Sequence, residues 1–139
     1  MKTAYIGATF DLPHYGHIRL INRAREMADR VVVVLNTDEF VQRFKNKTPI
    51  LNLQERIETL QGFKGVDIVD VNIGGEDSKP MLLKYKPDYI IFGDDYDIER
   101  YKKQIGVDDA FLTDNNMKLV QLPYTKEIST SNIIQRCRL

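Results

Sequence analysis

The sequence contains a single cysteine, Cys137, so the chain cannot form an internal disulfide. Such low cysteine usage is typical of a reducing compartment. No stretch approaches the roughly 20 consecutive apolar residues of a transmembrane helix, and the first residues lack the apolar core of a signal peptide. Net charge is absent as well, because 20 lysines and arginines balance 20 aspartates and glutamates. We therefore expect a cytoplasmic protein that binds no nucleic acid and no membrane, and that holds any polyanionic ligand by local charge.

Short apolar runs alternate with amphipathic stretches along the chain, which is the pattern of an α/β domain with a parallel sheet. The length of 139 residues suits one domain. We expect a single Rossmann-like domain over residues 1–139, in which helices cover both faces of a doubly wound, parallel, five-stranded sheet. The expected strands are 3–9, 31–35, 66–73, 88–92 and 118–122. The expected helices are 17–28, 52–61, 81–86, 98–104 and 129–136. Residues 40–52 fit either a mobile basic loop or a short helix followed by a loop.

Residues with binding or catalytic chemistry follow four of these strands, at the point where each strand ends. These segments are 10–17, 37–38, 93–95 and 124–130. In open α/β sheets, ligands bind outside the carboxyl ends of the strands, at the place where the strand order reverses. The sequence therefore predicts one site, built from four loops that lie far apart in the chain.

Both histidines of the chain lie in the tetrapeptide His14-Tyr15-Gly16-His17. The unpaired N–H groups and the dipole at a helix N-terminus favour a phosphate group, and Gly16 lets the backbone approach a ligand closely. Two alternatives remain open at this point, a surface turn with two incidental histidines and a zinc site. Zinc needs three or four protein ligands, and beyond the histidines only carboxylates such as Asp11 are at hand.

Residues 8–17 read Ala-Thr-Phe-Asp-Leu-Pro-His-Tyr-Gly-His. They resemble the Gly-Thr-Phe-Asp-x-x-His-x-Gly-His signature of the cytidylyltransferase-like nucleotidyltransferases, and most of all their bacterial glycerol-3-phosphate cytidylyltransferase group. Further blocks are similar to motifs of that group and come in the same order: Asn-Thr-Asp-Glu-Phe at 36–40, Glu-Arg at 55–56, Phe-Gly-Asp-Asp-Tyr at 92–96 and Ile-Ser-Thr-Ser at 128–131. The resemblance covers almost the whole chain, so it is far more specific than the tetrapeptide alone.

The resemblance implies an enzyme in which a phosphate oxygen of one substrate attacks the α-phosphorus of a nucleoside triphosphate and releases pyrophosphate. Catalysis would then rest on positioning and charge neutralisation. The residues implied to be catalytic are His14, His17 and Lys47. Those implied to bind the nucleotide are Thr9, Phe10, Gly16, Lys45, Lys64, Gly93, Asp94, Ile128, Ser129 and Thr130. Those assigned to the acceptor are Asp11, Asp38, Arg56 and Lys126. From the residues alone, Lys45 and Lys47 equally fit a solvated basic loop, and Ser129 equally fits a simple helix N-cap.

The resemblance also implies Mg²⁺, held mostly by phosphates and water, with no metal ligand assigned to the protein. It implies CTP in preference to ATP, a phosphate monoester as the acceptor, and a homodimer. We expect CMP transfer to a small phosphorylated alcohol, with glycerol 3-phosphate as the first candidate. Adenylyl transfer to a sugar phosphate or similar acceptor, and a non-catalytic nucleotide-binding module, remain alternatives.

The sequence departs from the family pattern at three places. Ala8 stands where the family has glycine, and Lys64 lies near the position of a family arginine, so the charge is kept without the bidentate fork. In the last motif, Tyr124 replaces an arginine and Glu127 replaces a glycine. Tyrosine donates one hydrogen bond and brings no charge, so we hypothesise that Lys126 supplies the missing cation. These departures leave the acceptor and the base open.

Overall fold

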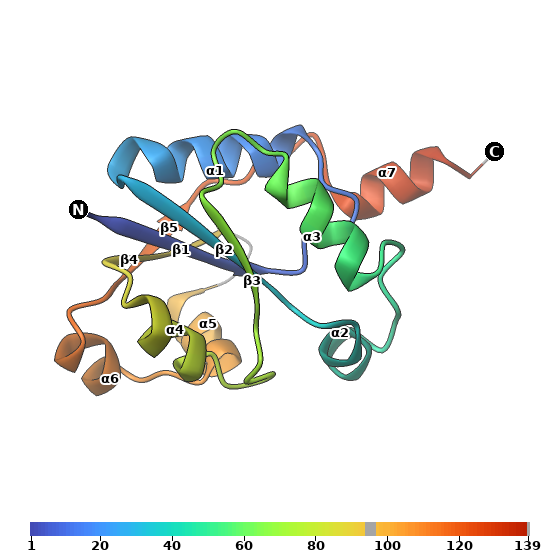
Figure 1. Cartoon of the computed structure of the whole chain (residues 1–139). Coiled ribbons are helices and arrows are strands. Elements are labelled where there is room, and N and C mark those ends of the chain that lie inside the picture. The colour runs from blue at the N-terminus through green and yellow to red at the C-terminus, as the bar shows by residue number, and fades with distance from the viewer. Residues whose placement is uncertain (94–96, 139) are drawn as a thin grey trace.

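The computed structural model describes residues 1–93 and 97–138, and in this part of the chain five strands form one sheet between two layers of helices (Figure 1). The strands are β1 (Thr3–Ala8), β2 (Arg30–Leu35), β3 (Ile68–Val71), β4 (Tyr89–Gly93) and β5 (Lys118–Leu122). The helices are α1 (Tyr15–Met27), α2 (Asp38–Lys45), α3 (Leu53–Gln61), α4 (Lys79–Tyr85), α5 (Ile98–Ile105), α6 (Asp109–Asp114) and α7 (Thr130–Arg136). None of the helices described is long and apolar enough to cross a membrane.

The strand order is β3-β2-β1-β4-β5, and every neighbouring pair is parallel. From β1 the chain builds outward to β2 and β3, then crosses to the other side of β1 for β4 and β5. The order therefore reverses between β1 and β4, which is the place where ligands bind in folds of this kind. The predicted fold class, a doubly wound parallel five-stranded sheet, is confirmed.

The sheet separates two apolar cores, and β2 contributes to both of them. Val31 and Val33 pack with α1 and α3 on one face, whereas Val32 and Val34 pack with α4, α5 and α6 on the other. All of these valines are fully buried, as expected for a central strand covered on both faces. Figure 1 shows α1 and α3 on one side of the sheet, with α4, α5 and α6 on the opposite side.

Several elements differ from the sequence prediction. Strand β3 covers only Ile68–Val71 of the expected 66–73, and α4 begins at Lys79, two residues earlier than expected. Helix α1 begins two residues earlier than expected, because His14 caps it. Residues 38–45 form a helix, which settles the choice left open for the basic segment in favour of a short helix followed by a loop. Helix α6 was not predicted; it is only six residues long, and the Asp108 carboxylate begins it by accepting a hydrogen bond from Phe111 N at 2.8 Å.

Leu82 and Leu83 in α4 provide a matched test of this packing. Leu82 is fully buried, whereas Leu83 is 46% exposed. Leu82→Ala should lower the free energy of unfolding by about 2–5 kcal/mol, because it removes buried apolar surface and leaves a cavity. Leu83→Ala should change it by less than about 1 kcal/mol. Urea denaturation followed by circular dichroism measures both, and equal losses from the two variants would contradict the arrangement of this core.

Candidate active site

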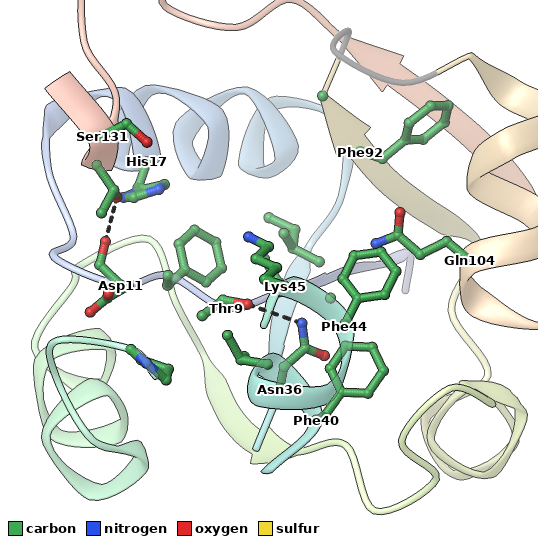
Figure 2. Close-up of a pocket in the computed structure, with 18 of the residues that line it drawn as sticks. Thr9, Asp11, His17, Asn36, Phe40, Phe44, Lys45, Phe92, Gln104 and Ser131 are labelled. Atoms are coloured by element: carbon green, nitrogen blue, oxygen red, sulfur yellow. Dashed lines mark hydrogen bonds between the residues drawn. The ribbon is translucent and has the colours of Figure 1, made fainter. Parts of the chain in front are cut away.

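A pocket of about 350 Å³ lies at the carboxyl ends of β1 and β4, where the strand order reverses (Figure 2). Its walls come from the β1–α1 loop, from α2 and the loop after it, from α5, from the segment after β5, and from α7. The volume is within the range of small-molecule sites. Segments that follow β1, β2, β4 and β5 therefore meet at one edge of the sheet, as the sequence predicted.

The two histidines form the N-terminal cap of α1. His14 is the N-cap residue, and its Nδ1 accepts a hydrogen bond from Gly16 N at 3.0 Å. In return, His17 Nδ1 accepts from His14 N at 3.1 Å. The two bonds make a reciprocal capping box, in which the rings stack with their centroids 3.9 Å apart. Phe10 packs edge-on against His17, with ring centroids 4.8 Å apart.

This capping box fixes the tautomer of both imidazoles. Because each Nδ1 accepts a hydrogen bond, the single proton of each neutral ring lies on Nε2, which becomes a donor. Burial, together with the neighbouring His14, lowers the pKa of His17 to about 3. Burial also lowers the pKa of His14. At neutral pH the helix N-terminus therefore presents two uncharged Nε2–H donors, an arrangement suited to an anion.

The loop that leads into this cap holds two residues in the left-handed region. Phe10 has φ 53° and Leu12 has φ 48°, a conformation that costs energy for residues with a Cβ. Phe10 is held there because its side chain is almost completely buried beside His17. The strained turn lets the chain leave β1 and reach the cap of α1 within a few residues.

Arg56 connects the loops that border the site. Its side chain is completely inaccessible to solvent. Nη1 donates to the carbonyl oxygens of Thr9 and Asn36 at 2.8 and 2.9 Å, and Nε donates to that of Leu51 at 3.1 Å. Nη2 donates to Asp38 Oδ1 at 2.7 Å. All three nitrogens are engaged, so the predicted contact of Arg56 with the acceptor is wrong, and Arg56 is a positioning residue.

The two predicted acceptor-binding aspartates also hold loops in place. Asp38 accepts from Arg56 through one oxygen and from Leu53 N through the other, at 3.2 Å. Asp38 is not among the pocket-lining residues, and its predicted role at the acceptor stays a prediction. The Asp11 carboxylate accepts from Ile50 N at 2.8 Å and from Leu51 N at 2.9 Å. Asp11 does line the pocket, and a role at the acceptor stays a prediction.

The basic segment after α2 faces the pocket. Lys45 is the last residue of the helix, which ends at Asn46 in the left-handed conformation. Both Lys45 and Lys47 line the pocket, and Figure 2 shows Lys45 pointing into it. Both lysines are also exposed, so their predicted roles at the phosphates stay predictions.

Lys64 lies at the opposite edge of the sheet, so the predicted nucleotide contact of this residue is wrong. Helix α3 begins beside the site and runs back along the sheet, and Lys64 follows its end. The adjacent Gly65 carbonyl accepts a hydrogen bond from Arg25 in the last turn of α1, far from the cap at its first turn. Lys126 is exposed and outside the lining of the pocket.

The segment that leads into α7 packs against the histidine cap. A Cβ on Gly16 would lie 2.9 Å from His14 Cε1 and 3.0 Å from Ile128 Cγ2. Gly16 is therefore needed for this packing, and its N–H is used in the cap; its predicted nucleotide contact stays a prediction. Ser129 caps α7 by accepting from Asn132 N at 3.0 Å, and the Thr130 hydroxyl donates to the Asp11 carbonyl.

Of the predicted site residues, the pocket lining contains Thr9, Phe10, Asp11, His17, Lys45, Lys47, Gly93 and Thr130. His14 stacks on His17 without lining the pocket itself. Ile128 and Ser129 are not part of the lining, and Asp94 lies outside the described residues. The positions in the lining fit the prediction, and the binding roles of these residues stay predictions.

Sequence reasoning missed several residues of the lining. These are Asn36, Phe40, Phe44, Tyr101, Gln104 and Ser131. The positions of Tyr101 and Gln104, three residues apart in α5, place them on one helix face. This spacing could have identified Tyr101 and Gln104 as site residues only if α5 had been known to border the site. Among the described residues, no group of three or more histidine, cysteine, aspartate or glutamate side chains is arranged to hold a metal ion.

The lowered pKa of His17 predicts a pH-dependent stability. The unfolded chain takes up a proton on this residue near pH 6.5, whereas the folded protein takes it up only near pH 3. Stability from this residue is therefore complete above pH 6.5 and decreases as the pH falls toward 3, by up to about 1.4 kcal/mol per pH unit.

His17→Gln provides the comparison, because glutamine at this position of a capping box still accepts from the N-cap N–H and does not titrate. Between pH 6.5 and 4 the wild-type protein should lose more unfolding free energy than this variant. Nitrogen NMR of the wild type should show the Nε2–H tautomer at pH 5. Equal pH profiles for the two proteins, or a charged His17 at pH 5, would contradict this geometry.

Known proteins match this chain over nearly its whole length. Residues 5–136 match the family model described as cytidylyltransferase-like. A glycerol-3-phosphate cytidylyltransferase from Staphylococcus aureus is 36% identical over 135 residues, which cover 97% of this chain and 94% of that protein. An FAD synthase from Pyrococcus horikoshii is 32% identical over 139 residues, covering 94% of this chain and 88% of the relative. Among solved structures, a lipopolysaccharide core biosynthesis protein from Thermoplasma volcanium aligns with a TM-score of 0.71 and 26% identity, over 88% of this chain and 96% of that one. The chain is therefore an enzyme, a nucleotidyltransferase that belongs to the cytidylyltransferase-like family.

Proposed function

We propose that the enzyme transfers CMP from CTP to a small phosphorylated alcohol, glycerol 3-phosphate first, and releases pyrophosphate. The observation that carries this proposal is the pair of neutral Nε2–H donors at the N-terminus of α1, beside a pocket bordered by Lys45 and Lys47. The choice of CTP and glycerol 3-phosphate is supported by the Staphylococcus aureus relative, which matches this chain almost end to end.

In this reaction a phosphate oxygen of the acceptor forms a bond to the α-phosphorus, and the bond from that phosphorus to the bridging oxygen breaks. Pyrophosphate leaves with the electron pair. No proton has to move, because a phosphate monoester is largely ionised at neutral pH. The protein therefore acts by orienting the two phosphates and by neutralising the charge that they bring together.

Five side chains would carry out these tasks. His14 and His17 donate from Nε2 to the triphosphate oxygens as uncharged groups, so they stabilise developing charge through fixed dipoles. The Thr9 hydroxyl oxygen accepts from Asn36 Nδ2 at 3.2 Å, which leaves its own proton available for a phosphate oxygen. Lys45 and Lys47 supply the positive charge that neutral histidines do not.

Magnesium enters the proposal only as an ion carried by the triphosphate. Mg²⁺ prefers oxygen ligands and commonly keeps phosphates and water in its shell. In the pocket lining, the Asp11 carboxylate is already engaged with two backbone N–H groups. In the part of the chain that the structure describes, no group of three or more histidine, cysteine, aspartate or glutamate side chains could hold a metal ion, so Mg²⁺ is assigned to the triphosphate and water.

Adenylyl transfer from ATP to flavin mononucleotide is the second candidate, and the aromatic walls of the pocket favour it. Phe40 and Phe44 stack with centroids 5.5 Å apart, and Phe92 and Tyr101 stack at 4.3 Å. Phe44 is 48% exposed although it is a large apolar side chain. Its exposed ring would suit a planar acceptor better than a glycerol chain, and FAD synthases are among the relatives.

Pyrophosphate release separates these candidates. The enzyme should be incubated with Mg²⁺ and with CTP or ATP, each combined with glycerol 3-phosphate, a sugar phosphate or flavin mononucleotide. The leading proposal expects pyrophosphate from CTP with glycerol 3-phosphate. If pyrophosphate forms only from ATP, with flavin mononucleotide or a sugar phosphate as acceptor, the corresponding adenylyl transfer replaces the leading proposal. Tight nucleotide binding without pyrophosphate from any pair would indicate a non-catalytic module.

His14→Asn separates the catalytic role of His14 from its capping role. Asparagine is a good N-cap residue, so its carbonyl oxygen replaces Nδ1 as the acceptor, while the Nε2–H donor is lost. We expect the melting temperature to stay within a few degrees and kcat to fall by roughly 100-fold to 1000-fold, as for other lost transition-state donors. His14→Ala should show the same loss of kcat and about 1 kcal/mol of lost stability. Wild-type turnover by His14→Asn would remove the donor role.

A further inference from the structure

The pocket lining includes residues from two parts of the fold. Phe44 lies in α2, whereas Gly93 and Tyr124 lie at the ends of β4 and β5. A reaction between two phosphate-bearing substrates needs room for the nucleoside and for the body of the acceptor. We assign the side at Phe44 to the body of the acceptor, so the side at Gly93 and Tyr124 is left for the nucleoside.

On the side of the pocket at the ends of β4 and β5, the ring of Tyr124 lies against Gly93. A Cβ added to Gly93 would come within 2.4 Å of both Cε2 and Cζ of Tyr124, so any residue other than glycine would displace the ring. Gly93 is the last residue of β4 and pairs with Leu122 of β5. Tyr124 comes two residues after Leu122 and folds back over this strand end. Its side chain is still 39% exposed, in the lining of the pocket.

The loop that carries Tyr124 is held against α1 on both sides of the ring. The carbonyl oxygen of Pro123 accepts a hydrogen bond from Arg23 Nη1, and Glu127 forms an ion pair with Arg19 at 3.2 Å. Glu127, which replaces a family glycine, therefore has a partner on the helix that carries the histidines. These contacts keep the ring in a fixed place relative to the phosphate donors.

We propose that Tyr124, seated on Gly93, is the stacking platform for the nucleobase. This inference rests on the proposed nucleotidyl transfer and assigns the base subsite within it. A tyrosine ring has a large apolar face and few rotatable bonds, so it contributes contact area at a small cost in conformational entropy. Stacking accepts any base, because every base has a π-face. The platform therefore strengthens binding of CTP and ATP alike, and the choice between them is made by other groups.

Isothermal titration calorimetry with CTP, ATP and inorganic tripolyphosphate tests the platform, because tripolyphosphate carries the charge without a base. Tyr124→Ala should weaken CTP and ATP binding by similar factors, between about 5-fold and 100-fold, and leave tripolyphosphate binding unchanged. Tyr124→Phe keeps the ring and should restore nucleotide affinity to within about 3-fold of the wild type. Gly93→Ala should resemble Tyr124→Ala, because the new methyl group displaces the ring.

Three results would overturn the platform. They are unchanged CTP and ATP affinity in Tyr124→Ala, an equal loss of affinity for tripolyphosphate, and a loss in Tyr124→Phe as large as that in Tyr124→Ala. Failure of the proposed function is visible separately in the wild-type enzyme. If the wild type binds CTP or ATP without forming pyrophosphate, the proposed transfer reaction is rejected. The role of Tyr124 is then still decided by the nucleotide affinities of its variants. If the wild type binds neither triphosphate, both are rejected.

Discussion

The rest of the site depends on the hydrogen bonds and the ion pair that the buried guanidinium of Arg56 makes. It joins the carbonyl oxygens of Thr9, Asn36 and Leu51, which follow β1, follow β2 and precede α3, and it pairs with Asp38. A buried charge is costly unless it is paired and its donors are satisfied. Here the cost is offset by the Asp38 carboxylate and by three backbone carbonyls that accept the hydrogen bonds of Arg56. Arg56 therefore ties the loop after β1, the loop after β2 and the segment before α3 together before any ligand binds.

The histidine cap illustrates how one pair of side chains serves both the fold and the chemistry. The Nδ1 atoms begin α1 by capping it, and the same hydrogen bonds leave the Nε2–H groups available as donors. The low pKa that burial gives His17 keeps the pair neutral. Lys45 and Lys47 lie on a separate, exposed segment at the end of α2. The neutral N–H donors and the positive charges that border the pocket therefore come from two different elements.

Much of the fold could be predicted from the sequence, because its strands are short apolar runs and Val31 to Val34 leave little choice of structure. Helix α6 was missed because six residues carry too little periodicity. The burial of Arg56 could not be predicted, since its acceptors are carbonyl oxygens brought together only by the folded sheet. The error at Lys64 was avoidable. Parallel strands require each connecting helix to run back along the sheet, so a residue after the end of α3 must lie at the edge opposite the site.

The central claim is that an acceptor phosphate attacks the α-phosphorus of a nucleoside triphosphate. Two labelling reactions test it most directly, one with triphosphate labelled at the α-phosphorus and one with label at the γ-phosphorus, each run with the best acceptor. The account predicts that the α-label appears in the acceptor product and that the γ-label appears only in pyrophosphate. Transfer of the γ-label to the acceptor, or release of the α-label as free nucleoside monophosphate without a labelled product, would contradict it.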